Sequence, residues 1–304
     1  MRLVFDHSYD LSIAGLTFQV SCPTLPICLE PAENYCNFTT TGRLHDHKDP
    51  VTVQLLLDEM PNLHGLTNIF NAGETWSLFG DDKKKFIVYR GAAAASSPLW
   101  LAHMNMLSRH VDVYCSPRFI NKQESGRHEI ISPCSYPLDQ ILLMYFLGSN
   151  GFVIHAAGAI HQGKGYIFAG PSGAGKSTIT MLLNESEDFT LFSDDRIVIS
   201  KSGNDFSISG TPWPGEAGIA SNCRAPLQKI FFLEKDGKNE VRAAGIHESL
   251  QKIMPVISLP WYDDKRLSGY LDVCGAVLEQ TPAFVLSFTP DPGSVDEIKK
   301  IVSD

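Results

Sequence analysis

The residues with the clearest chemical signature lie in one glycine-rich run near the middle of the chain, which reads Gly170-Pro-Ser-Gly-Ala-Gly-Lys-Ser177. Glycines at this spacing let successive backbone N–H groups turn inward around an anion, and a helix that begins at Lys176 adds the positive end of its dipole. The lysine can reach the outer phosphates of a nucleotide, and the Ser177 hydroxyl can ligate Mg²⁺. The run therefore predicts a site for a nucleoside triphosphate with Mg²⁺. Its residues are Gly170, Pro171, Ser172, Gly173, Ala174, Gly175, Lys176, Ser177 and Thr178.

Two adjacent carboxylates, Asp194 and Asp195, end the next apolar segment after this run. A nucleotide kinase needs one carboxylate to hold the Mg²⁺ that neutralises the β- and γ-phosphates, and often a second to accept the proton of the acceptor hydroxyl. Adjacent residues of a strand point to opposite sides, so the sequence leaves open which of the two is the base and which lies near the metal. The alternative is a solvated turn. However, the chain between Lys176 and the pair is about long enough for one helix and a short segment back to the sheet, which places the pair beside the glycine-rich run.

A histidine, a glutamate and an arginine are further candidates for the same site. His155 ends a short apolar run before the glycine-rich loop, although a single histidine at a strand end is often structural. Glu216 closes the stiff segment Gly210-Thr-Pro-Trp-Pro-Gly-Glu216. This segment either supplies a metal ligand or positions the acceptor, or it is a plain loop capped by an aromatic plug. Arg224, with Arg196 as a second choice, is a candidate clamp for the γ-phosphate, although a lone arginine is more often a surface residue.

The composition indicates a globular protein without a nucleic-acid or membrane partner. Of the 304 residues, 43% are apolar and 19% are charged, and the length suffices for two domains. The net charge of −9 argues against a broad nucleic-acid surface, which needs clustered Lys and Arg. We find no apolar run long enough for a membrane span and no signal peptide, and the 7 cysteines have an irregular spacing that favours free thiols. These features predict a cytoplasmic protein.

The apolar patterns predict two domains that position these residues. Region 1–135 has short alternating segments, which predict an antiparallel β-rich domain that binds substrate or a partner. Region 136–304 mixes strands and helices around the glycine-rich loop, which predicts an α/β domain that carries the catalysis. The expected strands are 16–21, 51–57, 85–89, 111–114, 152–155, 166–169, 190–193, 196–200, 206–209, 229–233 and 283–288. The expected helices are 136–147, 176–183, 249–256 and 264–279.

Together these motifs resemble the HPr kinase/phosphorylase family, whose catalytic domain is related to phosphoenolpyruvate carboxykinase. In that family a strand-end histidine precedes the glycine-rich loop, and a hydrophobic strand ending in Asp-Asp follows the helix of the loop. The matching features here are Val153-Ile-His155, Gly170 to Ser177, and Leu191-Phe-Ser-Asp-Asp195, so the resemblance covers roughly 150–235. The family's long signature segment after the acidic pair is replaced by Gly210 to Glu216, and region 1–135 shows no match. The chain therefore resembles a divergent member, and some of these are similar to kinases that modify precursor peptides in ribosomal-peptide clusters.

The resemblance implies a C-terminal α/β P-loop domain of the HPr kinase/PEP carboxykinase type, preceded by the β-rich domain. It also implies that the γ-phosphate of ATP, or of another nucleoside triphosphate, is transferred with Mg²⁺ to a serine hydroxyl of a protein or peptide. By residue, Lys176 and Ser177 would hold phosphate and Mg²⁺, and His155 would lie beside the acceptor. Asp194 or Asp195 would take the hydroxyl proton, with the other near the metal.

Two other functions stay open at this point. A nucleotide-binding regulatory or scaffold protein without kinase activity would use the same loop. Its N-terminal region would then be the surface that binds a partner. A kinase of a small-molecule alcohol such as free serine would share the chemistry and differ only in the acceptor. The sequence also leaves the oligomeric state open and is compatible with a homo-oligomer.

Overall fold

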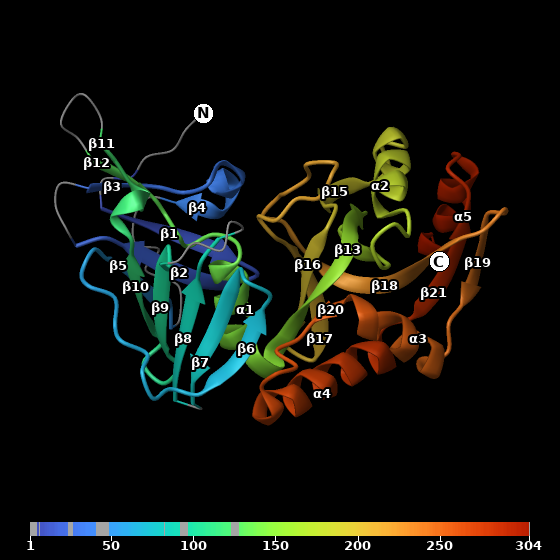
Figure 1. The fold of residues 1–304 in the computed structure, drawn as a ribbon. Helices are drawn as coiled ribbons and strands as arrows, with labels where there is room; N and C mark the ends of the chain where they lie inside the picture. The colour runs from blue at the N-terminus through green and yellow to red at the C-terminus, as the bar shows by residue number, and fades with distance from the viewer. Residues whose placement is uncertain are drawn as a thin grey trace. The chain divides into compact units, whose positions relative to one another are not determined.

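The computed structural model describes residues 5, 7–23, 27–40, 49–81, 83–91, 97–122 and 128–303. The chain forms two compact units, Met1–Phe146 and Leu147–Asp304 (Figure 1). The sequence places the boundary near residue 135, whereas the units divide later because helix α1 (Leu138–Leu147) packs into the first unit. There the Tyr35 hydroxyl donates a hydrogen bond of 2.7 Å to the buried Asp139 carboxylate.

The first unit is built on two β-sheets whose buried and outward positions alternate along the strands. In β5 (Val51–Leu56), for example, Val51, Val53 and Leu55 are buried and the residues between them are half-exposed. Among the described residues, the larger sheet has the order β4-β1-β2-β5-β10-β9-β8-β7-β6 and the smaller one β11-β12-β3. β5 pairs in parallel with β2 and with β10, and β12 pairs in parallel with β3. The expectation of a purely antiparallel domain is therefore wrong, and the sheets are mixed.

The other elements of the first unit have the following bounds. They are β1 (Ser8–Ile13), β2 (Leu16–Ser21), β3 (Ile27–Glu30), β4 (Thr39–Thr40), β6 (Asn68–Ala72), β7 (Trp76–Gly80), β8 (Lys84–Tyr89), β9 (Trp100–Asn105), β10 (His110–Cys115), β11 (Ile120–Lys122), β12 (His128–Ile131), and the 3-10 helices η1 (Glu33–Phe38) and η2 (Pro117–Phe119). Strands β2, β5, β8 and β10 correspond to segments that the alternating pattern predicts.

The second unit is a mixed α/β domain in which two long strands run through both parts of the sheet. The first half of β13 (Gly151–His161) pairs with β16 (Arg196–Ser202), and its second half pairs with β14 (Lys164–Ala169). β18 (Arg224–Lys235) begins beside β17 and continues in parallel with β14 and with β21 (Ala283–Phe288). The carboxyl ends of β14, β18 and β21 therefore lie at one edge of the sheet, where ligand-binding loops collect in α/β proteins.

Helices cover the sheet of the second unit on two sides (Figure 1). Because neighbouring residues of a strand point to opposite sides, Phe231 packs into a core with α2 and α5, and Phe232 packs into a second core with α3 and α4. Burial of each such side chain contributes about 1.5–3 kcal/mol. The remaining elements are α2 (Lys176–Glu185), β15 (Thr190–Ser193), β17 (Asp205–Gly210), β19 (Glu240–Ala243), α3 (Ile246–Ile253), β20 (Ile257–Ser258), α4 (Asp264–Gln280), α5 (Gly293–Val302), η3 (Gly148–Asn150) and η4 (Met254–Val256).

Several elements of the second unit begin at the residues that the sequence pattern predicts. Helices α2 and α4 and strands β15 and β21 begin at the predicted residues. β13 differs from its prediction, because it runs on to His161 and so places His155 inside a strand. The expectation that His155 ends a strand is wrong.

Two further observations concern the described residues as a whole. Within the described residues the longest helix is α4, with 17 residues, and no helix has the length and apolar composition needed to cross a bilayer. All 7 cysteines lie in the described part of the chain and are free thiols, as their spacing predicts.

Candidate active site

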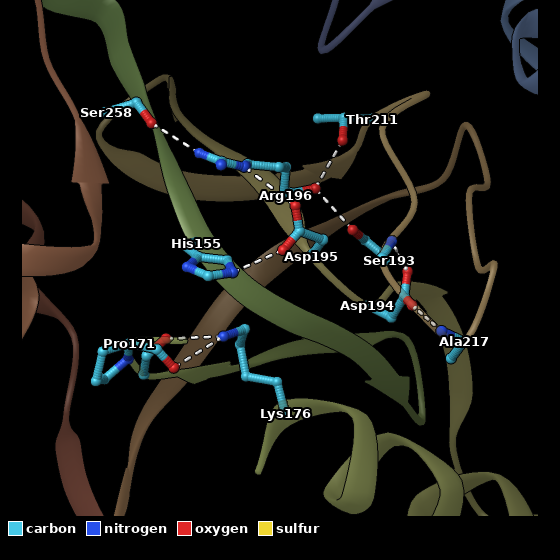
Figure 2. A network of polar contacts seen from close by, with 12 residues as sticks. His155, Pro171, Lys176, Ser193, Asp194, Asp195, Arg196, Thr211, Ala217 and Ser258 are labelled. Atoms are coloured by element: carbon cyan, nitrogen blue, oxygen red, sulfur yellow. Dashed lines mark hydrogen bonds and ion pairs between the residues drawn. The ribbon is translucent and has the colours of Figure 1, made fainter. Parts of the chain in front are cut away.

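The second unit contains a cleft of about 370 Å³ at the edge of the sheet where β14 ends. The glycine-rich loop and the start of α2 form one wall, and β13, the turn after β15 and the segment after β17 form the others. The structure thus brings together most of the residues that the sequence singles out, and Figure 2 shows the polar contacts at the centre. The lining residues are His155, Ser172, Gly173, Gly175, Lys176, Ser177, Thr178, Asp194, Asp195, Gly215, Glu216 and Lys235.

The loop has a backbone that requires glycine. Gly173 and Gly175 have φ angles of +78° and +102°, which other residues adopt only with strain. A Cβ on Gly175 would also lie 2.6 Å from Cζ of Phe288, so no side chain fits there. Gly175 precedes the first residue of α2, and the positive end of that helix therefore faces the cleft.

Lys176 is folded back onto the loop from which it extends. Its side chain is buried, and its Nζ donates hydrogen bonds to the carbonyl oxygens of Gly170 at 3.0 Å and Pro171 at 3.1 Å (Figure 2). Burial, together with the nearby charge of Arg196, lowers the pKa of Lys176 below its usual value, although Asp195 opposes the shift. Hydrogen bonds from an ammonium to a phosphate are stronger than those to a neutral carbonyl. An anion in the cleft would therefore attract Lys176 away from the two carbonyls.

Asp195 lines the cleft beside Asp194, and each of its oxygens has a side-chain partner. The Nε2 of His155 lies 2.6 Å from its Oδ1, and the Nε of Arg196 donates to its Oδ2 at 3.1 Å. Arg196 is held in turn by a hydrogen bond of 3.1 Å from its Nη1 to the Ser258 hydroxyl (Figure 2). Burial would raise the pKa of Asp195, but the hydrogen bond from His155 and the charge of Arg196 outweigh it and lower that pKa. Asp195 is therefore ionised at neutral pH.

Asp194 makes a different set of contacts from its neighbour. It is 2% exposed, and its Oδ1 and Oδ2 accept hydrogen bonds from the backbone N–H groups of Gly215 at 2.8 Å and Ala217 at 2.7 Å. The two aspartates diverge because β15 ends in a tight turn, in which the Ser193 hydroxyl donates to the carbonyl of Arg196 at 2.7 Å. Asp194 thus holds the segment after β17, while Asp195 points towards His155 (Figure 2).

Replacing Asp194 by asparagine is expected to lower the free energy of unfolding by about 1–3 kcal/mol, because one backbone N–H group would then face a donor instead of an acceptor. Thermal unfolding of the purified variant measures the loss. The matched control is Asp205→Asn, at an exposed position of β17, which should unfold like the wild type. Equal stability of both variants would mean that the segment does not depend on Asp194.

Glu216 lies between the two backbone groups that Asp194 holds. Its side chain is exposed and lines the cleft, while Trp213 of the same segment is 7% exposed and packs inside the unit. The segment therefore has both a buried aromatic side chain and a carboxylate at the cleft. The sequence leaves a structural loop and a loop that contributes to the site as alternatives, and the structure combines the two features. Because Asp194 fixes the backbone on both sides of Glu216, it also fixes the position from which that carboxylate extends.

The structure does not bring Arg224 to this cleft, and it places Lys235 there instead. Arg224 is the first residue of β18, and its Nε donates a hydrogen bond of 2.9 Å to the Ser207 hydroxyl. Lys235 is the last residue of the same strand, which has 12 residues. At a rise of about 3.3 Å per residue, the two ends lie roughly 35 Å apart. The only signal for Lys235 in the sequence is its position after the predicted strand 229–233.

Oxygen ligands in the cleft fit a hard cation. Among the described residues, no group of three or more His, Cys, Asp and Glu side chains is arranged to hold a metal ion. The Ser177 hydroxyl nevertheless lines one cleft with the carboxylates of Asp194, Asp195 and Glu216. Mg²⁺ is usually bound by one or two such protein ligands, with phosphate oxygens and water completing its shell. The residues present therefore fit Mg²⁺ that arrives with a phosphate substrate.

Comparisons with known proteins add little to this geometry. The sequence matches no family model and no curated protein. Among solved structures, the Hpr(Ser) kinase/phosphatase from Coxiella burnetii is similar over 50% of this chain and 88% of that chain, with 13% sequence identity and a TM-score of 0.30. At this TM-score the similarity says nothing about the reaction, which has to be inferred from the residues of the cleft.

Proposed function

We propose that this protein is an ATP- and Mg²⁺-dependent kinase that transfers the γ-phosphate to a serine hydroxyl of a protein or peptide. The observation that carries the proposal is the shared cleft of about 370 Å³, in which Lys176 and Ser177 lie with the hydrogen-bonded pair His155 and Asp195. A second carboxylate beside the one that would hold Mg²⁺ supports transfer, because it can accept the proton of an acceptor hydroxyl. The serine acceptor is inferred from the resemblance of the motifs to HPr kinases.

The residues on the loop side of the cleft would bind the phosphate chain of the nucleotide. The backbone of Gly173 and Gly175, the start of α2 and the ammonium of Lys176 provide positive charge at one point. Lys176 would exchange the carbonyls of Gly170 and Pro171 for phosphate oxygens when the nucleotide binds. Mg²⁺ held by Ser177 and an aspartate would neutralise the β- and γ-phosphates. Preorganised charge of this kind stabilises the transition state of phosphoryl transfer.

Asp195 is the group best placed to accept the acceptor's proton. Each of its oxygens already has one partner, and each keeps a second lone pair for the incoming hydroxyl. As the acceptor oxygen forms its bond to the γ-phosphorus, the bond from that phosphorus to the bridging oxygen breaks and ADP leaves. The hydroxyl proton passes to Asp195, and His155 and Arg196 hold the carboxylate in position.

The proposal is tested by incubating the protein with γ-labelled ATP and Mg²⁺ together with serine-containing peptides, and separately with free serine. We expect labelled phosphate on a hydroxyl group, and EDTA should remove the activity. Label on free serine but not on any peptide would move the acceptor to the small-molecule class. ATP binding without transfer to any acceptor would contradict the proposal and favour a regulatory nucleotide-binding protein.

A further inference from the structure

A hydrogen bond from Arg196 to Ser258 joins two strands that lie on opposite edges of β13. Val153 and Ile154 of β13 pair with β16 on one side and with β20 on the other. Arg196 is the first residue of β16, and Ser258 is the last residue of β20. The arginine side chain therefore spans β13 to donate from its Nη1 to the Ser258 hydroxyl at 3.1 Å, as Figure 2 shows.

The two side chains lie on the same face of the sheet as His155. Arg196 is the cross-strand partner of His155, and partners of this kind share a face. Ser258 is the partner of Val153, which lies two positions before His155 and so points the same way. Neighbouring strands are about 4.8 Å apart, so β16 and β20 are separated by roughly 10 Å. Only a long side chain bridges that separation, and arginine has the necessary length.

The contacts of Arg196 indicate a role at the carboxylate instead of at the phosphates. Its Nε donates to Oδ2 of Asp195 at 3.1 Å, so one guanidinium contacts both Asp195 and Ser258. The described residues that line the cleft do not include Arg196. The sequence offers Arg196 as a second candidate clamp for the γ-phosphate, whereas the structure directs its Nε at a carboxylate and its Nη1 at a hydroxyl.

Both oxygens of Asp195 are thereby fixed relative to one strand, β13. His155 of β13 contacts Oδ1 directly, with its Nε2 at 2.6 Å. Arg196 contacts Oδ2, and the backbone of its partner Ser258 is fixed by pairing with β13. An arginine held at one end only would retain much of the rotational freedom of its long side chain. The contact with Ser258 removes that freedom, so both oxygens of the carboxylate have a defined partner.

We propose that Arg196 is a positioning residue for phosphoryl transfer, which Ser258 holds from β20 so that the Asp195 carboxylate keeps the orientation needed to accept the proton of the acceptor hydroxyl. The inference rests on the proposed function, because it takes Asp195 to be the base. It goes further by giving Ser258 a part in the reaction. It also assigns the effect of both residues to the carboxylate and none of it to the phosphate chain.

The shape of the Arg196 side chain can be tested separately from its charge. A lysine at this position keeps the positive charge, but its single nitrogen cannot take the places of both Nε and Nη1. Arg196→Lys therefore removes the contact with two partners and leaves the net charge beside the cleft unchanged. Ser258→Ala removes only the hydroxyl that holds the guanidinium, and Ser258→Thr retains a hydroxyl at the same position.

The test measures transfer from γ-labelled ATP with Mg²⁺ to the serine-containing peptides and the free serine that test the proposed function. We expect kcat to fall by about 10–100-fold in Arg196→Lys and by about three- to tenfold in Ser258→Ala. Ser258→Thr should keep most of the wild-type rate. The matched control is Ser207→Ala, which removes a serine that also accepts from an arginine, Arg224, outside the cleft. This control should transfer phosphate at the wild-type rate.

Binding measurements distinguish a positioning residue from a phosphate ligand. Isothermal titration calorimetry with Mg²⁺–ATP and with Mg²⁺–tripolyphosphate, which has the phosphate chain without the nucleoside, should give wild-type dissociation constants for Arg196→Lys and Ser258→Ala. Weaker binding of tripolyphosphate by Arg196→Lys would make Arg196 a phosphate ligand and would overturn the inference.

A double variant tests whether Ser258 acts through Arg196. Once the arginine is absent, loss of the hydroxyl should have no further effect, so Arg196→Ala/Ser258→Ala should transfer phosphate at the rate of Arg196→Ala alone. Losses that multiply in the double variant would show that Ser258 acts by another route and would contradict the inference.

The outcomes also separate this inference from the proposed function. If the wild type transfers phosphate and both Arg196→Lys and Ser258→Ala do so at the same rate, the inference alone is wrong. If the wild type transfers phosphate to no acceptor, the proposed function fails, and this inference fails with it. Thermal unfolding is measured for every variant. A rate that falls in Ser258→Ala and returns in Ser258→Thr follows the hydroxyl and not a folding defect.

Discussion

Replacing Asp195 by asparagine is expected to lower the rate of phosphoryl transfer by about 10²–10⁴-fold, the usual contribution of a general base. Asparagine keeps the size of the side chain and can still accept a hydrogen bond from Arg196, but it cannot take up a proton. The loss should appear in kcat, because the phosphate chain is bound mainly by the loop on the other side of the cleft. Calorimetric titration with ATP should show at most a small change in affinity.

Two variants serve as comparisons for Asp195→Asn. Asp205→Asn removes a carboxylate from an exposed position of β17 and should transfer phosphate at the wild-type rate. His155→Gln removes the ring that lies 2.6 Å from Asp195 and should lower the rate by less than Asp195→Asn does, since the base itself remains. Transfer by Asp195→Asn at the wild-type rate would rule out the proposed base.

The sequence does not show which of the two aspartates contacts His155 and which one bonds to the backbone of the segment after β17. Their proximity to the loop is predictable, since a strand and a short helix separate them from Lys176. Both line the cleft, and which one contacts His155 depends on the turn after β15, where the hydroxyls of Ser193 and Thr211 both donate to the carbonyl of Arg196. Thr211 lies on the far side of a hairpin, so this contact is set by tertiary structure and has no local signal.

Arg224 and Lys235 illustrate a second limit of sequence reasoning. Apolar pattern identifies the buried middle of β18 at 229–233, while the strand itself extends from Arg224 to Lys235. Element ends are the least predictable part of a strand, because charged residues continue it without an apolar signal. Both residues are cations near the predicted strand, and the parallel pairing of β18 with β14 decides that Lys235, at the carboxyl end, reaches the loop.

The fold shows the same contrast between local and long-range information. Helix α2 and strand β21 begin where the periodicity and the flanking glycine or proline residues predict, because those signals are local. The parallel pairing of β5 with β2 and β10 joins segments that are distant along the chain, and a two-residue alternation is the same in parallel and antiparallel strands. Alternation therefore predicts the strands but not their directions.

Replacing Lys176 by methionine is expected to lower phosphoryl transfer by about 10²–10³-fold and to weaken ATP binding as well. Methionine retains the unbranched apolar stem and removes the ammonium that now bonds to the carbonyls of Gly170 and Pro171. The effect should differ in kind from that of Asp195→Asn, because the charge of Lys176 acts on the phosphates in both the bound and the transition state. Loss of affinity together with loss of rate is the pattern that a phosphate ligand produces.

The comparison for this variant is Lys201→Met, which removes an exposed ammonium from β16 and should leave both the dissociation constant of ATP and the rate unchanged. Tripolyphosphate provides a sharper measurement, since it reports on the phosphate site alone. Its affinity should fall in Lys176→Met and stay at the wild-type value in Lys201→Met. If Lys176→Met bound tripolyphosphate like the wild type, the phosphate chain would not lie at the loop, and the assignment of the cleft would have to be abandoned.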